Sequence, residues 1–247
     1  MKKINVIVLF ICLTLLFLTG CGTTPDVETA VVENVEPTEE KETTTEVPVQ
    51  STPEVTETGL PEGEIMITSL PELQAALEDP AIKVIHINSA MDINSEISFE
   101  RNDDLEIHIE KDGTMMINSD FMPVACIITN DGTMIVNKTF ERGITTLVNN
   151  GTIIIQAGGK MSSGMSNTEN HGTFTVEPEA ELSIDRGSVF NNYTNLTNNG
   201  LVSVDNGGQL NDVGGTIENN GTIDLFAFFN GDIANITGTG TLNDHRE

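Results

Sequence analysis

A short phrase, Asn-(Asn/Asp)-Gly-Thr followed by an apolar residue, recurs with variations from about residue 111 to the C-terminus and constrains the fold more than any other feature. Its glycines step along the chain by 19, 19, 21, 28, 21 and 19 residues, and they are Gly113, Gly132, Gly151, Gly172, Gly200, Gly221 and Gly240. A near-constant period of this size is typical of a solenoid, in which each repeat buries its apolar face only against its neighbours.

Each glycine of the phrase is followed by a strand pattern. Apolar residues stand two and four positions after the glycine, as Ile153 and Ile155 do after Gly151. This period of two predicts a β-strand with one face inward, and the further apolar positions in each interval predict two or three short strands per turn. We therefore expect an all-β fold, a parallel β-helix with coils of about 20 residues.

Two further expectations follow from the repeat. Stacked asparagines form ladders of amide hydrogen bonds, and the expected ladder consists of Asn130, Asn149, Asn170, Asn198 and Asn219. The 28-residue interval predicts a protruding loop over residues 186–195, because insertions in such repeats usually map to loops.

The N-terminal residues 1–20 have the pattern of a secretory signal. Lys2 and Lys3 precede an apolar run that ends in Leu18-Thr19-Gly20-Cys21. These four residues resemble the lipobox of bacterial lipoproteins. The resemblance implies that Cys21 is diacylated and becomes the mature N-terminus, which would anchor the chain by lipid to the extracytoplasmic face of a bacterial cell membrane without a spanning helix.

Residues 21–64 and 65–247 differ sharply in composition. The first segment has twelve acidic residues against the single base Lys41, together with Thr, Pro and Val, and predicts a disordered acidic linker. The second segment predicts one domain. It opens with a strand, a capping-box pattern at Ser69–Glu72 and apolar residues at helical spacing up to Asp79-Pro80, so we expect a short helix that covers the first coil.

This order of strand, Ser-Leu-X-Glu-Leu-X-X-Ala-Leu helix, Ile-rich coil and Asn-Gly-Thr coils resembles the pectate-lyase-like β-helices of bacterial surface and adhesive proteins. The resemblance covers residues 65–247 and implies a right-handed parallel β-helix. It implies no particular activity, because the same fold hosts lyases, hydrolases, adhesins and inert stalks.

Charge and cysteine content restrict the partners. The net charge of −27 excludes the basic surface that nucleic acid requires and favours cations. After loss of Cys12 with the signal and acylation of Cys21, Cys126 stands alone, so we expect it to fill the core. Membrane contact is expected through the N-terminal lipid only, and an extracellular polysaccharide or a cell-surface partner is the expected ligand class.

Three groups of residues are candidates for chemistry. Asp112 and Asp131 precede glycines one repeat apart and offer a Ca²⁺ site, although Asp is also simply tolerated before Gly; no other cofactor is expected. His86 and His108 also lie about one coil apart and point outward, but the sequence does not place the further ligands that Zn²⁺ needs.

The third group is Asp185 and Arg186, with Glu177, Glu179, Glu181 and Arg142 in neighbouring coils, and it offers the acids and the base of a polysaccharide-lyase site. The family positions do not match residue by residue. The absence of Trp and the single Tyr193 argue against a sugar-binding cleft. The sequence thus favours an adhesin-like or structural module over a carbohydrate-active enzyme, and a spacer without a ligand stays open as a third alternative.

Overall fold

The computed structural model describes residues 59–101 and 104–246. The expected signal peptide, Cys21 and nearly all of the expected linker lie outside these residues. Within them, the only α-helix is far too short to cross a lipid bilayer.

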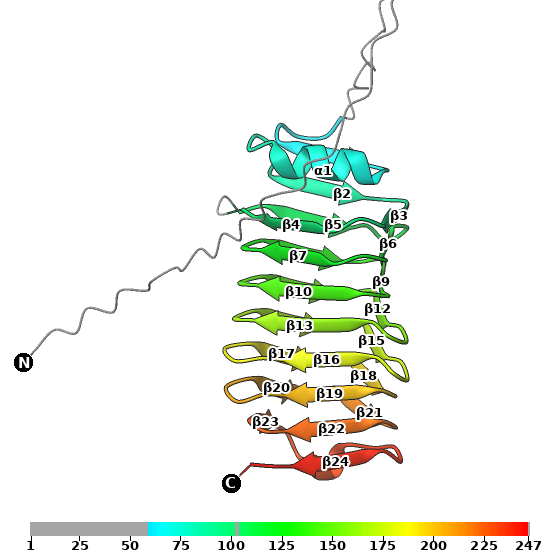
Figure 1. Ribbon diagram of the computed structural model, residues 1–247, viewed down its shortest axis with the longest axis vertical. Helices are drawn as coiled ribbons and strands as arrows, with labels where there is room; N and C mark the ends of the chain where they lie inside the picture. The colour runs from blue at the N-terminus through cyan, green and yellow to red at the C-terminus, as the bar shows by residue number, and fades with distance from the viewer. Residues whose placement is uncertain (1–58, 102–103, 247) are drawn as a thin grey trace, which may run out of the picture. The chain divides into compact units, whose positions relative to one another are not determined.

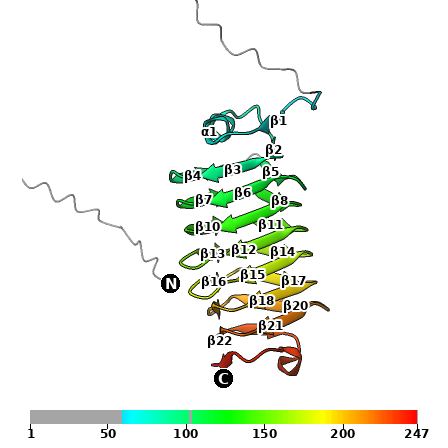
Figure 2. The same cartoon turned by 90° about the vertical axis from the view of Figure 1, so that its right-hand side faces the viewer.

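The described residues wind into a parallel β-helix, so the predicted fold is confirmed (Figures 1 and 2). The successive coils stack along one axis, and a typical coil places one strand in each of three sheets, which we call A, B and C. Every strand pairs in parallel with its counterparts in the neighbouring coils, at offsets of 19 to 22 residues along sheet A from β8 to β20.

Sheet A contains β1 (Glu64–Ile67), β2 (Val84–Ile87), β5 (Glu106–Ile109), β8 (Ile127–Asn130), β11 (Thr146–Asn149), β14 (Asn167–Asn170), β17 (Val189–Asn192), β20 (Gln209–Asp212) and β23 (Phe228–Asn230). Sheet B contains β3 (Ala90–Ile93), β6 (Thr114–Ile117), β9 (Thr133–Val136), β12 (Thr152–Ile155), β15 (Thr173–Val176), β18 (Asn195–Asn198) and β21 (Thr216–Asn219). Sheet C contains β4 (Ile97–Glu100), β7 (Phe121–Val124), β10 (Thr139–Gly143), β13 (Lys160–Gly164), β16 (Glu181–Ile184), β19 (Leu201–Val204), β22 (Thr222–Leu225) and β24 (Thr241–Asp244).

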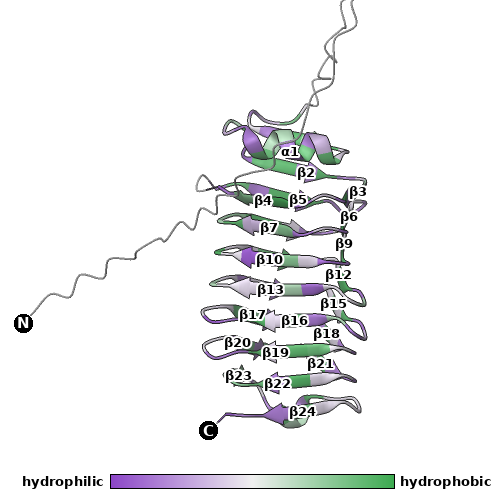
Figure 3. Cartoon of the chain, in the orientation of Figure 1, coloured by the Kyte–Doolittle hydropathy of each residue, from purple (hydrophilic) through white to green (hydrophobic). Residues whose placement is uncertain are grey.

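The core is a continuous column of inward side chains. Alternate residues of the strands point inside, and one cluster of buried apolar residues extends from Ile67 to Phe229. In Figure 3 apolar residues recur from coil to coil, whereas the C-terminal strand β24 is mostly hydrophilic. Because this core lies wholly within the described residues, the β-helix has what an independently folding unit needs.

The predicted asparagine ladder forms, but as two ladders. In sheet A, Asn130 donates to Asn149 (Nδ2–Oδ1 2.7 Å), Asn149 to Asn170 (2.8 Å) and Asn170 to Asn192 (2.8 Å). The second ladder, Asn198 to Asn219 (2.8 Å), belongs to sheet B. All of these side chains are buried, so each amide also needs a second partner, which it finds in a backbone carbonyl, such as that of Thr173 for Asn149 (3.1 Å).

The repeated phrase changes corner along the chain, which corrects the expectation of a protruding loop. The phrases at Gly132, Gly151 and Gly172 connect sheet A to sheet B, whereas those at Gly200 and Gly221 connect sheet B to sheet C. The 28-residue interval is therefore one full coil plus one further strand and corner. Within the expected loop, residues 189–192 form β17 and Asn195 begins β18.

The repeated phrase requires glycine because the backbones of successive coils stack closely, and not because glycine adopts a positive φ there. Gly151 does not adopt a positive φ. A Cβ atom at Gly151 would overlap the carbonyl oxygen of Gly132 in the preceding coil, and one at Gly172 would overlap that of Gly151. Glycine is needed here because the backbones of successive coils approach too closely for a side chain.

The helix α1 (Leu70–Glu78) lies over the first coils, as predicted (Figure 2). Ser69 is its N-cap, and the carboxylate of Glu72 accepts the backbone N–H groups of Thr68 (2.7 Å) and Ser69 (3.0 Å). The helix buries Leu73, Ala76 and Leu77 against the end of the core. It thus covers apolar side chains that the first coil would otherwise expose. A short 3₁₀ helix, Ile233–Asn235, follows β23 near the other end.

Candidate metal centre and surface hollows

His86 on β2 and His108 on β5 are direct neighbours on the outer face of sheet A. The register pairs them across the two strands, and their ring centroids lie 5.4 Å apart at an interplanar angle of 67°. The inward alternation of Ile85, Ile87 and Ile107 forces both imidazoles outward, as the sequence predicts.

Three carboxylates surround the two rings. His86 Nδ1 lies 2.7 Å from Glu110 Oε1 and His86 Nε2 lies 3.0 Å from Glu64 Oε2, while His108 Nε2 lies 2.9 Å from Glu106 Oε2. Burial by itself lowers the pKa of His86, but the hydrogen bonds to Glu110 and Glu64 outweigh it, so the pKa lies above its ordinary value. The carboxylates around the two imidazoles therefore favour a positive charge at this position.

Glu110 is a candidate metal ligand that the sequence analysis did not identify. It directly follows β5 and stands two residues after His108 on the same face, so that one donor atom each of His86, His108 and Glu110 lies within 4.8 Å of the others. The alternation of Glu106, His108 and Glu110 in the sequence is the pattern that could have identified it. The sequence does not show, however, that this alternation continues beyond the end of the strand.

The register also decides the neighbour of Asp131. The backbone N–H of Asp131 bonds to Ile109 just as that of Glu110 bonds to Ile87, so Asp131 stacks on Glu110 and not on Asp112. Lys111 and Asp112 are extra residues in a four-residue connection, where the next coil has only two. Asp131 Oδ1 accepts a hydrogen bond from the side-chain amide of Asn150 (2.7 Å), which occupies the equivalent turn position of the next coil.

Asp185 and Arg186 line one hollow at the end of β16, together with Asp205, Asn206 and Phe226. Asp185 accepts a hydrogen bond from Ser183 (2.6 Å), and Asp205 accepts one from Ser203 (2.7 Å) on the next coil. The structure therefore adds a second carboxylate, Asp205, to the two candidates. It lies one coil from Asp185 because the Ser-X-Asp pattern repeats.

Arg142 does not belong to this hollow. It lies on β10 beside the inward Phe140, is fully buried, and its Nε and Nη1 have no hydrogen-bond partner. Burial lowers the pKa of its guanidinium to about 10. The expectation that Arg142 supports a surface site is wrong, because period-two alternation after Phe140 turns its side chain into the core.

Cys126 is buried as expected, next to the corner where sheet C leads into sheet A. Burial raises the pKa of its thiol to about 11. The same corner carries exposed apolar side chains, Ile127 (37% exposed), Ile144 (58%) and Met165 (66%), which we call the apolar ridge. A hollow beside it is lined by residues that include Arg101, Asp104 and Ile144.

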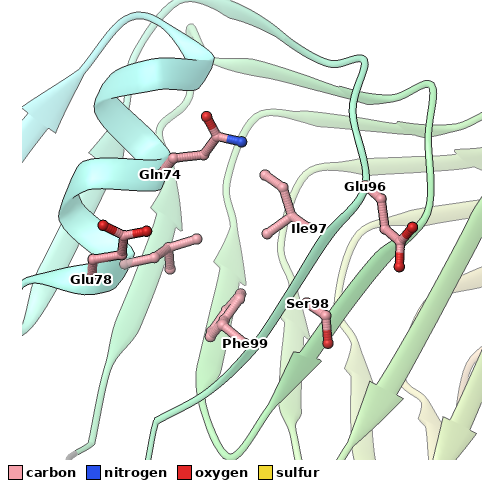
Figure 4. Close-up of a pocket in the computed structure, with 7 residues that line it drawn as sticks. Gln74, Glu78, Glu96, Ile97, Ser98 and Phe99 are labelled. Atoms are coloured by element: carbon pink, nitrogen blue, oxygen red, sulfur yellow. The ribbon is translucent and has the colours of Figure 1, made fainter.

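A further hollow lies between α1 and β4 (Figure 4). Glu78 on the helix and Glu96 before the strand stand on opposite sides of it, with Ile97 and Phe99 between the two elements. The residues that line this hollow include two carboxylates and no basic side chain, so it offers no general acid paired with a cationic group.

No protein-family model matches the chain, and neither the curated proteins nor the solved structures that were searched contain a match. The resemblance to pectate-lyase-like β-helices thus rests on the sequence pattern alone, and the parallel β-helix is compatible with a binding module or an enzyme.

Proposed function

We propose that this chain is a bacterial surface lipoprotein whose β-helix is an adhesin-like binding module, and that the apolar ridge makes the contact. The Leu18–Cys21 sequence supports the lipid anchor, and the acidic composition of residues 21–64 supports a spacer between the anchor and the module. The proposed partner is a protein of a cell surface, because the ridge is aliphatic and lacks the aromatic platforms that sugars prefer.

The observation that carries this proposal is the backbone conformation of the ridge. Ile144 and Met165 both have φ of 53°, a left-handed conformation that costs an L-residue roughly 1–2 kcal/mol. The corresponding corner in the next two coils is two residues longer and has Gly187 and Gly207 at this point, with φ of 82° and 87°. Glycine would therefore build this corner without strain, yet the chain presents two large apolar side chains to solvent.

The test uses soluble residues 22–247 and measures their retention on whole cells and on immobilised polysaccharides, with and without Ca²⁺. Asn tolerates the left-handed conformation, so Ile144→Asn and Met165→Asn remove apolar surface without removing the corner. We expect both variants to lose retention on cells. The matched control is Val213→Asn, at an exposed apolar residue of another corner, which should leave retention unchanged.

Retention that survives both ridge substitutions would contradict the proposed contact surface. If no cell or polysaccharide retains the wild-type protein, the binding role fails as a whole and a spacer without a ligand becomes the better account.

The second candidate function is a carbohydrate-active enzyme, and one observation favours it. Asp185, Asp205 and Arg186 line the same hollow, which gives two carboxylates and a guanidinium on one face. Release of oligosaccharide from a polysaccharide substrate that is lost in Asp185→Ala and Asp205→Ala, but kept in Ile144→Asn, would establish the enzyme and displace the adhesin.

A further inference from the structure

We propose that His86, His108 and Glu110 bind a divalent transition metal, with Zn²⁺ as the ion that suits them best. This site is independent of the apolar ridge and of the proposed adhesive role. Two imidazole nitrogens and a carboxylate oxygen form a donor set that Zn²⁺ accepts, whereas Ca²⁺ takes oxygen donors only.

The distances fit with small side-chain movements. Bonds of about 2.0–2.1 Å in a tetrahedral site place neighbouring donor atoms roughly 3.3 Å apart. The donor atoms of His86, His108 and Glu110 already lie within 4.8 Å of one another on half-buried side chains. The backbone need not move, because β2 and β5 are paired at four successive residues and both are interior strands of sheet A.

The remaining carboxylates occupy the positions of supporting partners. A metal bound to Nδ1 of each ring leaves Nε2–H of His86 to donate to Glu64 (3.0 Å) and Nε2–H of His108 to donate to Glu106 (2.9 Å). A carboxylate behind each metal-bound imidazole fixes its tautomer and increases its basicity. The present hydrogen bond from His86 Nδ1 to Glu110 (2.7 Å) marks the place that the ion would take.

Charge supports the same conclusion. Glu64 and Glu110 contact the ring of His86, Glu106 contacts that of His108, and Asp131 stacks on Glu110. A divalent ion balances this local negative charge more fully than one protonated imidazole does. Three protein donors leave the fourth coordination position of a tetrahedral ion for water.

The experiment titrates residues 22–247, freed of metal by dialysis against a chelator, with ZnCl₂ in millimolar Ca²⁺. The Ca²⁺ suppresses loose binding to the acidic surface. We expect one equivalent of Zn²⁺ to bind in isothermal calorimetry, and His86→Gln and His108→Gln each to weaken the affinity at least about ten-fold. His171→Gln is the matched control, since His171 also faces a glutamate, Glu169, at 3.5 Å but lies outside the cluster, and it should bind Zn²⁺ like the wild type.

Co²⁺ gives a second readout that does not depend on any variant. A tetrahedral site with nitrogen and oxygen donors gives Co²⁺ an intense visible absorption, which equimolar Zn²⁺ should abolish. The proposal fails if stoichiometric binding is absent, if Ca²⁺ removes it, if both histidine variants, folded by circular dichroism, keep the wild-type affinity, or if Co²⁺ shows only the weak spectrum of a hydrated ion.

Discussion

The buried asparagine ladder of sheet A predicts a large and position-dependent loss of stability. Asn149 accepts from Asn130 (2.7 Å) and donates to Asn170 (2.8 Å) and to the carbonyl of Thr173 (3.1 Å), and its side chain is fully buried. Asn149→Ala removes three hydrogen bonds of about 1 kcal/mol each and leaves buried polar atoms unpaired, which costs more. We expect a loss of about 3–5 kcal/mol in the free energy of unfolding.

A substitution at the end of the ladder should lower the free energy of unfolding by less. Asn130 donates to Asn149 and to the carbonyl of Thr152, but its own Oδ1 has no partner, because the next residue in this column is Ile109. Asn130→Ala thus removes two hydrogen bonds together with one unpaired acceptor. We expect a loss of about 2 kcal/mol. The matched control is Asn150→Ala, which removes one exposed hydrogen bond to Asp131 and should cost at most about 0.5 kcal/mol.

The assay is equilibrium unfolding of residues 22–247 in guanidinium chloride, followed by far-ultraviolet circular dichroism because the chain has no Trp. Repeat proteins lose cooperativity locally, so the slope of the transition must be the same in each variant before free energies are compared. The reasoning is refuted if Asn149→Ala is as mild as Asn150→Ala, or if Asn130→Ala costs more than Asn149→Ala.

Three further predictions concern the core and the corners. Gly151→Ala should destabilise by about 3 kcal/mol or more because backbone atoms cannot make room, whereas Gly164→Ala, which meets only one atom at 3.9 Å, should be nearly neutral in the same unfolding assay. Arg142→Met should raise the free energy of unfolding by up to about 3 kcal/mol, since burial lowers the pKa of Arg142 to about 10 and the cost of burying its charge applies below pH 10; a loss of stability instead would contradict this reasoning. Cys126, whose pKa burial raises to about 11, should resist iodoacetamide at pH 8 in the folded protein and react in 6 M guanidinium chloride, as mass spectrometry would show; rapid labelling of the folded form would contradict the packing.

The period, the inward alternation and the capping helix could be predicted because each depends on local chemistry. Ile153 and Ile155 define an inward face by spacing alone, and the Ser69–Glu72 pattern marks a helix start wherever it lies. The same alternation predicted that His86 and His108 point outward. These features need no knowledge of which coil packs on which.

The features that could not be predicted depend on register between coils. The length of the interval from Gly172 to Gly200 does not show why it is longer than the others. An inserted loop and a shift of the phrase to another corner both add residues. Asp112 and Asp131 match when counted from their glycines, yet two extra residues in one connection place Asp131 on Glu110. Small differences in connection length therefore decide which side chains meet at the corners of the coils.

Arg142 illustrates a different kind of error, because the local alternation by itself predicts where its side chain lies. Thr139-Phe140-Glu141-Arg142 alternates, so the rule that places Phe140 inside also places Arg142 inside. Burying an unpaired guanidinium is so costly that a surface role was the natural expectation. In a solenoid, the pairing of strands between coils decides the direction of a side chain more strongly than the polarity of that residue does. The stability of the remaining core offsets the unfavourable burial.

Because the coils share the same order of strands, the differences between coils at one position carry information about function. At the corner from sheet C to sheet A, Gly187 and Gly207 show what the backbone requires, and Ile144 and Met165 depart from it at a cost in strain. On the outer face of sheet A, the column of His86 and His108 continues into Thr129. The paired imidazoles are thus specific to two coils and are not a product of the repeat, which is the pattern expected of a site added to a structural scaffold.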